Sequence, residues 1–302
     1  MKRCTHRSTI LFVVAGAALV SLFVLAERVA SAQSQDVVDV PGPNLPTIQS
    51  GIDSLPNGGT VRIAVKTYKE HVVIDGKPVV LEGAGPANSK RPTIKADDPE
   101  NAVIAFVNGG GGAVRNLILQ GGAFGIAAGA EESEQCIESG SALEVEGVDI
   151  LKSGRGIYGS FGSLTVLSTE ISRTGASGIS LVESGDLLIS GVSVHDNGGA
   201  GVVLFNYDVP PGASMRRIEN SEFRKNKGGG IDVRGGALPV TIDTCTVSTN
   251  KIFGINLFAA HNTTITNSAM SFTQPVPGTA EFGDGLRVFR SNPVALTACT
   301  LA

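Results

Sequence analysis

The feature that most constrains the fold of this chain is a short pattern that recurs eight times. In each copy an apolar residue is followed two positions later by a small residue, Asn or Thr, and three positions after that by a second apolar residue. The copies begin at Val114, Val145, Val166, Ile189, Ile218, Ile242, Ile265 and Leu296. Consecutive copies lie 21 to 24 residues apart, except for three intervals of 29 to 31 residues. A fixed period of this length indicates a repeat architecture.

A second pattern, Gly followed by an aliphatic residue, comes after the first in seven units. It begins at Gly125, Gly156, Gly178, Gly201, Gly230, Gly254 and Gly285. Each unit has room for two or three short strands, which cannot bury an apolar side alone but can do so when the units stack as coils. We therefore predict an all-β chain folded as a right-handed parallel β-helix. A leucine-rich repeat would need regular leucines and helical segments, and a propeller would need about forty residues per blade.

The first coil of the solenoid is expected to have a cover. Ile48, Ile52 and Leu55 fall on one face of a short helix, and Thr47 can cap its first turn. We expect this helix to close the end of a domain that spans residues 47–302, with residues 33–46 as a linker.

Residues 1–32 have the layout of a secretory signal peptide. A basic start precedes an uncharged apolar run over residues 10–26, and Ala30-Ser31-Ala32 offers a cleavage site. The alternative is an uncleaved membrane anchor. Cleavage would place the protein outside the cytoplasm, either secreted, periplasmic or at the cell surface, with no membrane segment left. The formal charge of −4 argues against nucleic acid as a partner.

Three stretches carry a family resemblance: residues 47–53 (Thr-Ile-Gln-Ser-Gly-Ile-Asp), 57–61 (Asn-Gly-Gly-Thr-Val) and 67–70 (Thr-Tyr-Lys-Glu). They resemble the opening of right-handed β-helix proteins of the pectate-lyase-like superfamily, including pectin methylesterases and NosD-like repeat proteins. Residues 195–202 resemble the NosD-like repeats. The resemblance implies the fold over residues 47–302 and a carbohydrate as partner. The methylesterase and polygalacturonase catalytic motifs are missing, and Trp is absent.

The strand after each Gly alternates inward and outward side chains, so the second and fourth residues after Gly should point out. One outward column then contains Phe205, Arg234, Phe258 and Phe289, and its neighbour contains Asp232, Asn256 and Arg287. We expect a polysaccharide or cell-surface glycan to bind along this face, with aromatic faces against sugar rings. The predicted binding residues are Phe205, Arg234, Asn256, Phe258, Arg287 and Phe289. In the alternative interpretation Asp232 pairs with an arginine and the phenylalanines lie under inserted loops.

Catalysis is a separate hypothesis. His195-Asp196 partly resembles the Asp-Pro-His-Asp motif of β-helix alginate epimerases, although Ser193-Val194 stands where Asp-Pro would be. Asp232 and Arg234 are further candidates for an acid and a cation. Two main hypotheses from different function classes stay open, together with a NosD-like periplasmic accessory role. The first is a protein that binds glycans without catalysis. The second is a lyase, epimerase or hydrolase for acidic glycans.

No cofactor is expected. Calcium is possible, but the acidic clusters at residues 97–100 and 131–138 are typical of a solvated surface. Cys245 and Cys299 occupy the same repeat position two coils apart, about 9.6 Å at the usual strand spacing, and should remain unpaired. Inserted segments are expected at residues 128–141, 206–215 and 271–283. Nothing in the sequence covers the last coil, so end-to-end association is a further expectation.

Overall fold

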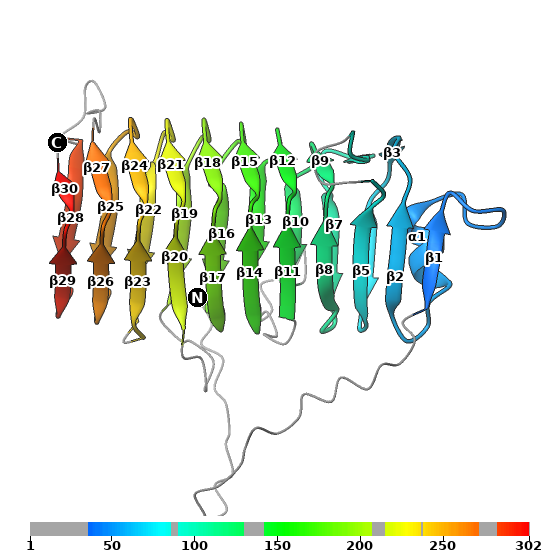
Figure 1. Cartoon of the computed structure of the whole chain (residues 1–302), viewed down its shortest axis with the longest axis horizontal. Coiled ribbons are helices and arrows are strands. Elements are labelled where there is room, and N and C mark those ends of the chain that lie inside the picture. The colour runs from blue at the N-terminus through cyan, green and yellow to red at the C-terminus, as the bar shows by residue number, and fades with distance from the viewer. Residues whose placement is uncertain are drawn as a thin grey trace, which may run out of the picture.

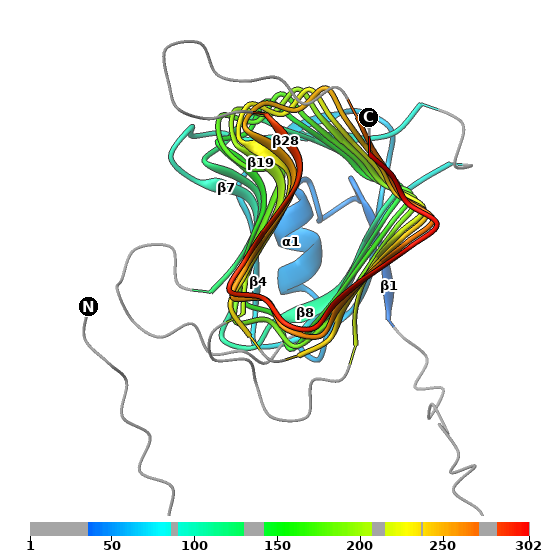
Figure 2. The same cartoon turned by 90° about the vertical axis from the view of Figure 1, so that its left-hand side faces the viewer.

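The computed structural model describes residues 36–85, 90–129, 142–206, 215–236, 238–271 and 283–301. Their coils stack along one long axis, and each side of the stack is a parallel sheet (Figure 1). Seen down the axis, three sheets enclose one interior (Figure 2). The predicted parallel β-helix is confirmed. The leader and most of each inserted segment lie outside the described residues.

We name each sheet by its first strand. The β1 sheet contains, in the described residues, β1 (Val37–Val40), β2 (Gly59–Ile63), β5 (Pro78–Gly83), β8 (Gly111–Arg115), β11 (Ala142–Glu146), β14 (Ser163–Leu167), β17 (Asp186–Ser190), β20 (Arg216–Glu219), β23 (Val240–Asp243), β26 (Thr263–Thr266) and β29 (Val294–Thr297). The β3 sheet contains β3 (Thr67–Lys69), β6 (Thr93–Lys95), β9 (Ile118–Gln120), β12 (Asp149–Leu151), β15 (Glu170–Ser172), β18 (Ser193–His195), β21 (Glu222–Arg224), β24 (Thr246–Ser248), β27 (Ala269–Ser271) and β30 (Thr300–Leu301). The β4 sheet contains β4 (Val72–Asp75), β7 (Ala102–Val107), β10 (Phe124–Ala128), β13 (Arg155–Gly159), β16 (Ile179–Val182), β19 (Ala200–Phe205), β22 (Gly229–Arg234), β25 (Phe253–Phe258) and β28 (Asp284–Phe289).

The repeat positions form the core because they align from coil to coil. Val145 pairs with Val166, and Val166 with Ile189, and all three are fully buried. The aliphatic residues that follow each Gly also align from coil to coil and point into the core. Ile179 and Val202, for example, are direct partners and fully buried. Alternation along each strand then turns the neighbouring residues outward. The described part of the chain contains no helix that could span a lipid bilayer.

The predicted capping helix is α1 (Ile48–Asp53), and Thr47 caps it. Its first backbone amides donate to the Glu70 carboxylate, with distances of 3.0 and 3.2 Å to one oxygen from Ile48 N and Gln49 N. Lys77 Nζ donates to carbonyls at the other end, at 2.8 and 2.9 Å. These contacts satisfy groups that a helix leaves unpaired at its ends.

The solenoid begins earlier than the sequence indicated. Residues 37–40, expected within a linker, form strand β1, which pairs with β2. Val40 is 1% exposed and belongs to the core. Strand β1 is the first strand of its sheet among the described residues, and residues 37–40 carry no copy of the repeat pattern. Its valines nevertheless favour an extended chain beside a sheet edge.

A ladder of asparagines lines the turn between the β3 and β4 sheets. Asn197, Asn226 and Asn250 are fully buried. Asn197 Nδ2 donates to Asn226 Oδ1 at 3.0 Å, and Asn226 Nδ2 donates to Asn250 Oδ1 at 3.1 Å. These side chains link successive coils, which satisfies polar groups that water cannot reach.

The predicted free cysteines are confirmed. Cys245 and Cys299 are unpaired, and Ser268 lies between them in the stack, with its hydroxyl accepting from Cys245 N at 3.1 Å. Burial raises the pKa of the Cys245 thiol to about 12, so it is unreactive at neutral pH.

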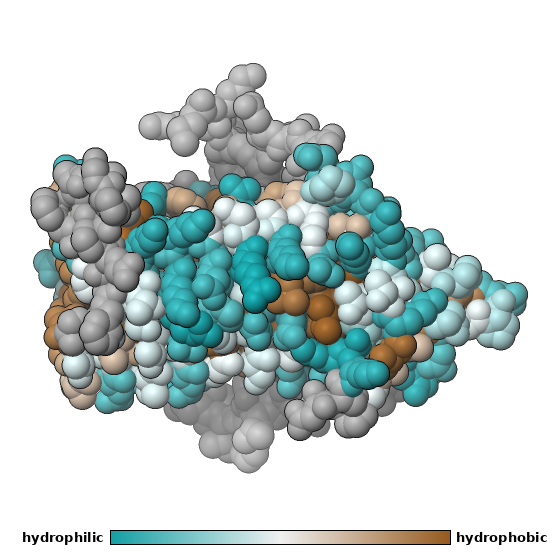
Figure 3. Space-filling view, turned by 90° about the horizontal axis from the view of Figure 1, so that it is seen from above, coloured by the Kyte–Doolittle hydropathy of each residue, from teal (hydrophilic) through white to brown (hydrophobic). Residues whose placement is uncertain are grey.

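Hydrophilic residues dominate the side seen in Figure 3, and hydrophobic residues gather at the end formed by β28, β29 and β30. There Val288, Leu296 and Leu301 are 45%, 46% and 55% exposed.

Candidate binding face

The outward side chains of the β4 sheet form two parallel columns. The outer column is Phe205, Arg234, Phe258 and Phe289, each the direct partner of the next. The floor column lies beside it and runs Val203, Asp232, Asn256 and Arg287. This is the alignment that the Gly-aliphatic pattern predicts.

Val203 and Asp232, the first two residues of the floor column, are sheltered although they point away from the core. Val203 is 7% exposed and Asp232 only 2%. Figure 2 shows why, because the strands of this sheet bow toward the interior of the solenoid.

A hollow of about 440 Å³ opens on this face, lined by Arg234, Asn256, Phe258, Arg287, Val288 and Phe289. Five of these are residues predicted to bind a ligand. The sixth predicted residue, Phe205, lies at one edge with the Arg234 guanidinium 5.5 Å from the centre of its ring. The structure thus brings the predicted set together.

Asp232 is fully engaged by its neighbours. One carboxylate oxygen accepts from Arg234 Nε at 2.9 Å and Nη2 at 2.6 Å. The other accepts from Asn256 Nδ2 at 2.8 Å. This is the pairing of Asp232 with an arginine that the alternative interpretation included. The other half of that interpretation concerns the inserted loops, most of which lie outside the described residues. A buried carboxylate held on both oxygens is suited to positioning Arg234 and Asn256 rather than to accepting a proton.

The aromatic rings do not lie as the sequence suggested. Phe258 and Phe289 stack on each other, with centroids 5.4 Å apart and planes inclined by 20°. The guanidinium of Arg290 lies 5.1 Å from the Phe289 centroid. One face of each ring is thus taken by protein, so fewer ring faces are available to a ligand than the sequence suggested.

Arg287 is held in place by Asp284 and Phe253. Its Nε and Nη2 lie 2.9 and 2.8 Å from the Asp284 carboxylate, and the guanidinium lies 5.8 Å from the Phe253 centroid. Phe253 itself lies over Gly229, where an added Cβ would come within 2.2 Å of the ring. Only glycine leaves room for this ring, and the backbone φ of +145° also suits glycine.

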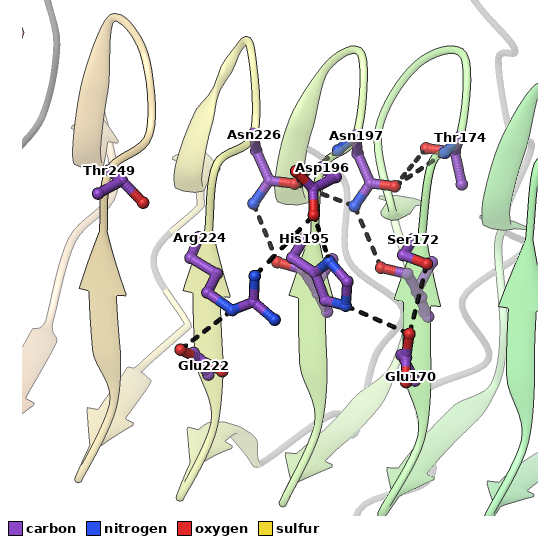
Figure 4. A network of polar contacts seen from close by, with 12 residues as sticks. Glu170, Ser172, Thr174, His195, Asp196, Asn197, Glu222, Arg224, Asn226 and Thr249 are labelled. Carbon is purple, nitrogen blue, oxygen red and sulfur yellow. Dashed lines mark hydrogen bonds and ion pairs between the residues drawn. The ribbon is translucent and has the colours of Figure 1, made fainter.

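His195 and Asp196 lie elsewhere, on β18 and the turn that follows it (Figure 4). His195 Nδ1 is 2.7 Å from the Asp196 carboxylate, and Nε2 is 3.2 Å from Glu170 Oε1. Arg224 Nη1 lies 3.9 Å from Asp196. The hydrogen bond from His195 lowers the pKa of Asp196, helped by the charges of His195, Lys225 and Arg224. A histidine thus sits between two carboxylates beside a guanidinium.

Sequence reasoning missed several partners in both places. Glu170 and Arg224 complete the His195 cluster, and Phe253 and Asp284 support Arg287. The column alignment was the available signal, since Ser172, His195 and Arg224 are direct partners in the β3 sheet.

Metal ligands do not converge in the described part of the chain, where no three His, Cys, Asp or Glu side chains are grouped to hold an ion. In the acidic cluster at residues 97–100, Asp98 accepts from the backbone of Glu100 at 2.9 Å, as in an ordinary turn. The cluster at residues 131–138 lies outside the described residues.

Comparison with solved structures finds the same architecture in polysaccharide-related proteins. The A-module of a mannuronan C-5 epimerase from Azotobacter vinelandii has a TM-score of 0.61 and 17% identity, covering 83% of this chain and 71% of the module. A periplasmic alginate epimerase gives a TM-score of 0.44 and 14% identity over 80% of this chain and 57% of its own. The catalytic domain of an alpha-1,3-glucanase gives a TM-score of 0.49 and 13% identity, covering 89% of this chain and 59% of that domain. At 17% identity the likeness to the epimerase A-module shows the fold alone, and the two structures with TM-scores below 0.5 support no conclusion.

No curated protein matches the chain. The family model described as the right-handed β-helix region matches residues 102–270 and 177–301, which is more than half of the chain. This match is broader than the NosD-like group that the repeats resemble. Together with the three parallel sheets, it shows that the chain belongs to the right-handed β-helix family.

Proposed function

We propose that this protein binds an extended polysaccharide along the β4 sheet, without catalysis at that face. The observation that carries the proposal is the hollow of about 440 Å³ in which residues from three consecutive coils converge. Ligand sites are typically concave and combine apolar side chains with a few oriented polar groups. The glycan-acting names of the structural relatives agree with a glycan ligand but do not carry the argument.

The two guanidinium groups that line the hollow favour an acidic glycan. They belong to Arg234 and Arg287, each of which is oriented by a carboxylate on its own strand. An arginine held in this way binds a carboxylate or sulfate with little further loss of side-chain freedom. Asn256 supplies an amide for hydroxyl groups between them.

The test is equilibrium binding of the purified protein to a polyuronate, a sulfated glycan and a neutral glucan. We expect binding to the acidic polymers and a loss of roughly tenfold in affinity for Arg287→Ala, about the value of one charge-assisted hydrogen bond. Arg115→Ala is a matched control. Its side chain is 37% exposed against 35% for Arg287, and it pairs with Glu144 on the β1 sheet. Equal binding by both variants would refute the site.

A second candidate function rests on the His195 cluster, which supports acid–base chemistry on an acidic glycan. In a lyase or epimerase a base removes the proton beside the sugar carboxylate while a cation holds that carboxylate. A lyase then expels the linking oxygen, which takes up a proton, and an epimerase returns a proton to the opposite face of the sugar. His195, oriented by Asp196, is suited to the first role, and Arg224 to the second. Glu170 is 46% exposed, so it can leave His195 Nε2 to a substrate.

Incubation with polyuronates tests this candidate. A lyase releases unsaturated chain ends that absorb ultraviolet light, and an epimerase alters the sugar signals in NMR spectra. Either product should disappear in His195→Ala but persist in His261→Ala, a change at a half-buried histidine whose ring contacts the Asn292 carbonyl. Product formation that survives His195→Ala would exclude the cluster, and binding without any product would leave the first proposal alone.

Export from the cytoplasm forms part of the proposal. It is supported by the leader-like composition of residues 1–32 and by unpaired, buried Cys245, which tolerates an oxidising compartment. Cell fractionation with antibody detection would test it, and accumulation of the uncleaved chain in the cytoplasm would argue against it.

A further inference from the structure

A second group of aromatic and cationic side chains lies on the β4 sheet, nearer its first strand. Phe124 on β10 and Tyr158 on β13 stack with centroids 5.1 Å apart and planes inclined by 23°. The Arg155 guanidinium lies 5.1 Å from the Tyr158 centroid and 5.9 Å from that of Phe124. We call these three residues the upper platform.

The upper platform rests on its own small apolar base. Phe124 packs against Ala102, Ala105 and Ala127, a cluster separate from the main core. Ala105 and Ala127 point outward, yet they are only 2% and 4% exposed. A supported ring of this kind loses little freedom when a ligand binds.

Arg155 is exposed, and it has no carboxylate partner within the described residues. It differs in this respect from Arg287, which pairs with Asp284. An arginine held over aromatic rings keeps its outer N–H groups available for an anion. The upper platform therefore offers the same chemistry as the hollow, with an apolar surface beside a guanidinium.

The two places lie on one line. Tyr158 pairs with Ser180, and Ser180 with Val203, so Tyr158 continues the floor column. From Tyr158 to Arg287 the column crosses five coil intervals, or about 24 Å at the spacing of parallel strands. The side chains between them, Ser180 and Val203, are small and each 7% exposed. A chain-like ligand can therefore pass from one place to the other.

We propose that the upper platform is a second subsite for the same acidic polysaccharide, so that full affinity requires a chain at least about 24 Å long. This inference rests on the proposed function and adds the ligand's length and a second anchoring point. A ligand that reaches both subsites gains affinity because the second contact forms within an existing complex.

The experiment measures binding of size-fractionated polyuronate oligosaccharides, from lengths that fill only the hollow to lengths well above 24 Å. For the unaltered protein we expect affinity to rise at least tenfold once the oligosaccharide spans both subsites. Arg155→Ala and Tyr158→Ala should each bind the long oligosaccharide no more tightly than the short one. Tyr158→Phe keeps the stacked ring and should keep most of the gain. Arg62→Ala, an exposed arginine on the β1 sheet, is the control. Circular dichroism verifies folding.

The outcomes separate the two proposals. If short and long oligosaccharides bind the unaltered protein equally, or if Arg155→Ala and Tyr158→Ala keep the gain, the second subsite is refuted. If Arg287→Ala still weakens the binding of short oligosaccharides in that case, the proposed binding site in the hollow is retained. If no oligosaccharide of any length binds, both proposals fall.

Discussion

The Asp232 carboxylate lies on the outward side of its sheet and is 2% exposed, and it holds the Arg234 guanidinium at 2.6 and 2.9 Å. This pair differs from the surface ion pairs of the solenoid, because one partner is buried while the arginine side chain is 45% exposed. Removing the carboxylate also leaves Asn256 without its acceptor.

We therefore predict that Asp232→Ala lowers the free energy of unfolding by about 1–3 kcal/mol, the cost of hydrogen bonds lost at a buried charged group. Urea unfolding followed by circular dichroism measures this. Asp39→Ala is the control, since Asp39 pairs with Arg62 but is 73% exposed, and it should cause no measurable change. Equal effects of the two variants would show that burial of Asp232 contributes nothing.

The asparagine ladder gives a second prediction. Asn226 is fully buried and makes side-chain hydrogen bonds to Asn197, Asn250 and the Val194 carbonyl. Asn226→Ala leaves several buried groups unpaired at once and should cost about 3 kcal/mol. Asn267→Ala removes one exposed bond to Asp243 and should cost far less. A small effect at Asn226 would mean that water replaces the ladder.

The alignment of the two columns could be predicted because it follows from the period of the Gly-aliphatic pattern and from the inward–outward alternation along each strand. Once Gly201, Gly230 and Gly254 are aligned, Phe205, Arg234 and Phe258 must become neighbours. No other property of these residues was needed. Strand β1 was not predicted because its sequence is not one of the repeated units. Only its pairing with β2 in the structure identifies it as a strand.

Side-chain direction could not be predicted in the same way. Phe258 and Phe289 were expected to offer ring faces to sugars, but the coil spacing lets them stack on each other instead. Their χ angles depend on neighbours such as Arg290, which no periodic pattern specifies. Similarly, the Glu170 side chain on β15 contacts His195 on the neighbouring strand β18, although the strand register pairs His195 with Ser172.

Gly229 is predicted to be essential for the shape of the face. Gly229→Ala places a methyl group against the Phe253 ring, which supports Arg287, at a position where φ is +145°. We expect a loss of about 1–3 kcal/mol in stability from strain and overpacking, and weaker glycan binding. Gly109→Ala is the control, because it also has a positive φ, +79°, but has no atom within 4 Å of the added Cβ. If Gly109→Ala is equally harmful, backbone strain alone explains the effect.

The His195–Asp196 contact predicts a pH dependence in acid. The pKa of Asp196 is lowered in the folded protein, mainly by the hydrogen bond from His195. The folded state therefore binds this proton less readily than the unfolded state, where the pKa is near its usual 3.8. The resulting stabilisation is complete above that usual value and is lost as the pH falls through the lower folded value. His195→Asn should flatten the fall of stability below about pH 4. Thermal unfolding of both proteins over this range measures the difference, and parallel curves would show that His195 does not stabilise the Asp196 carboxylate.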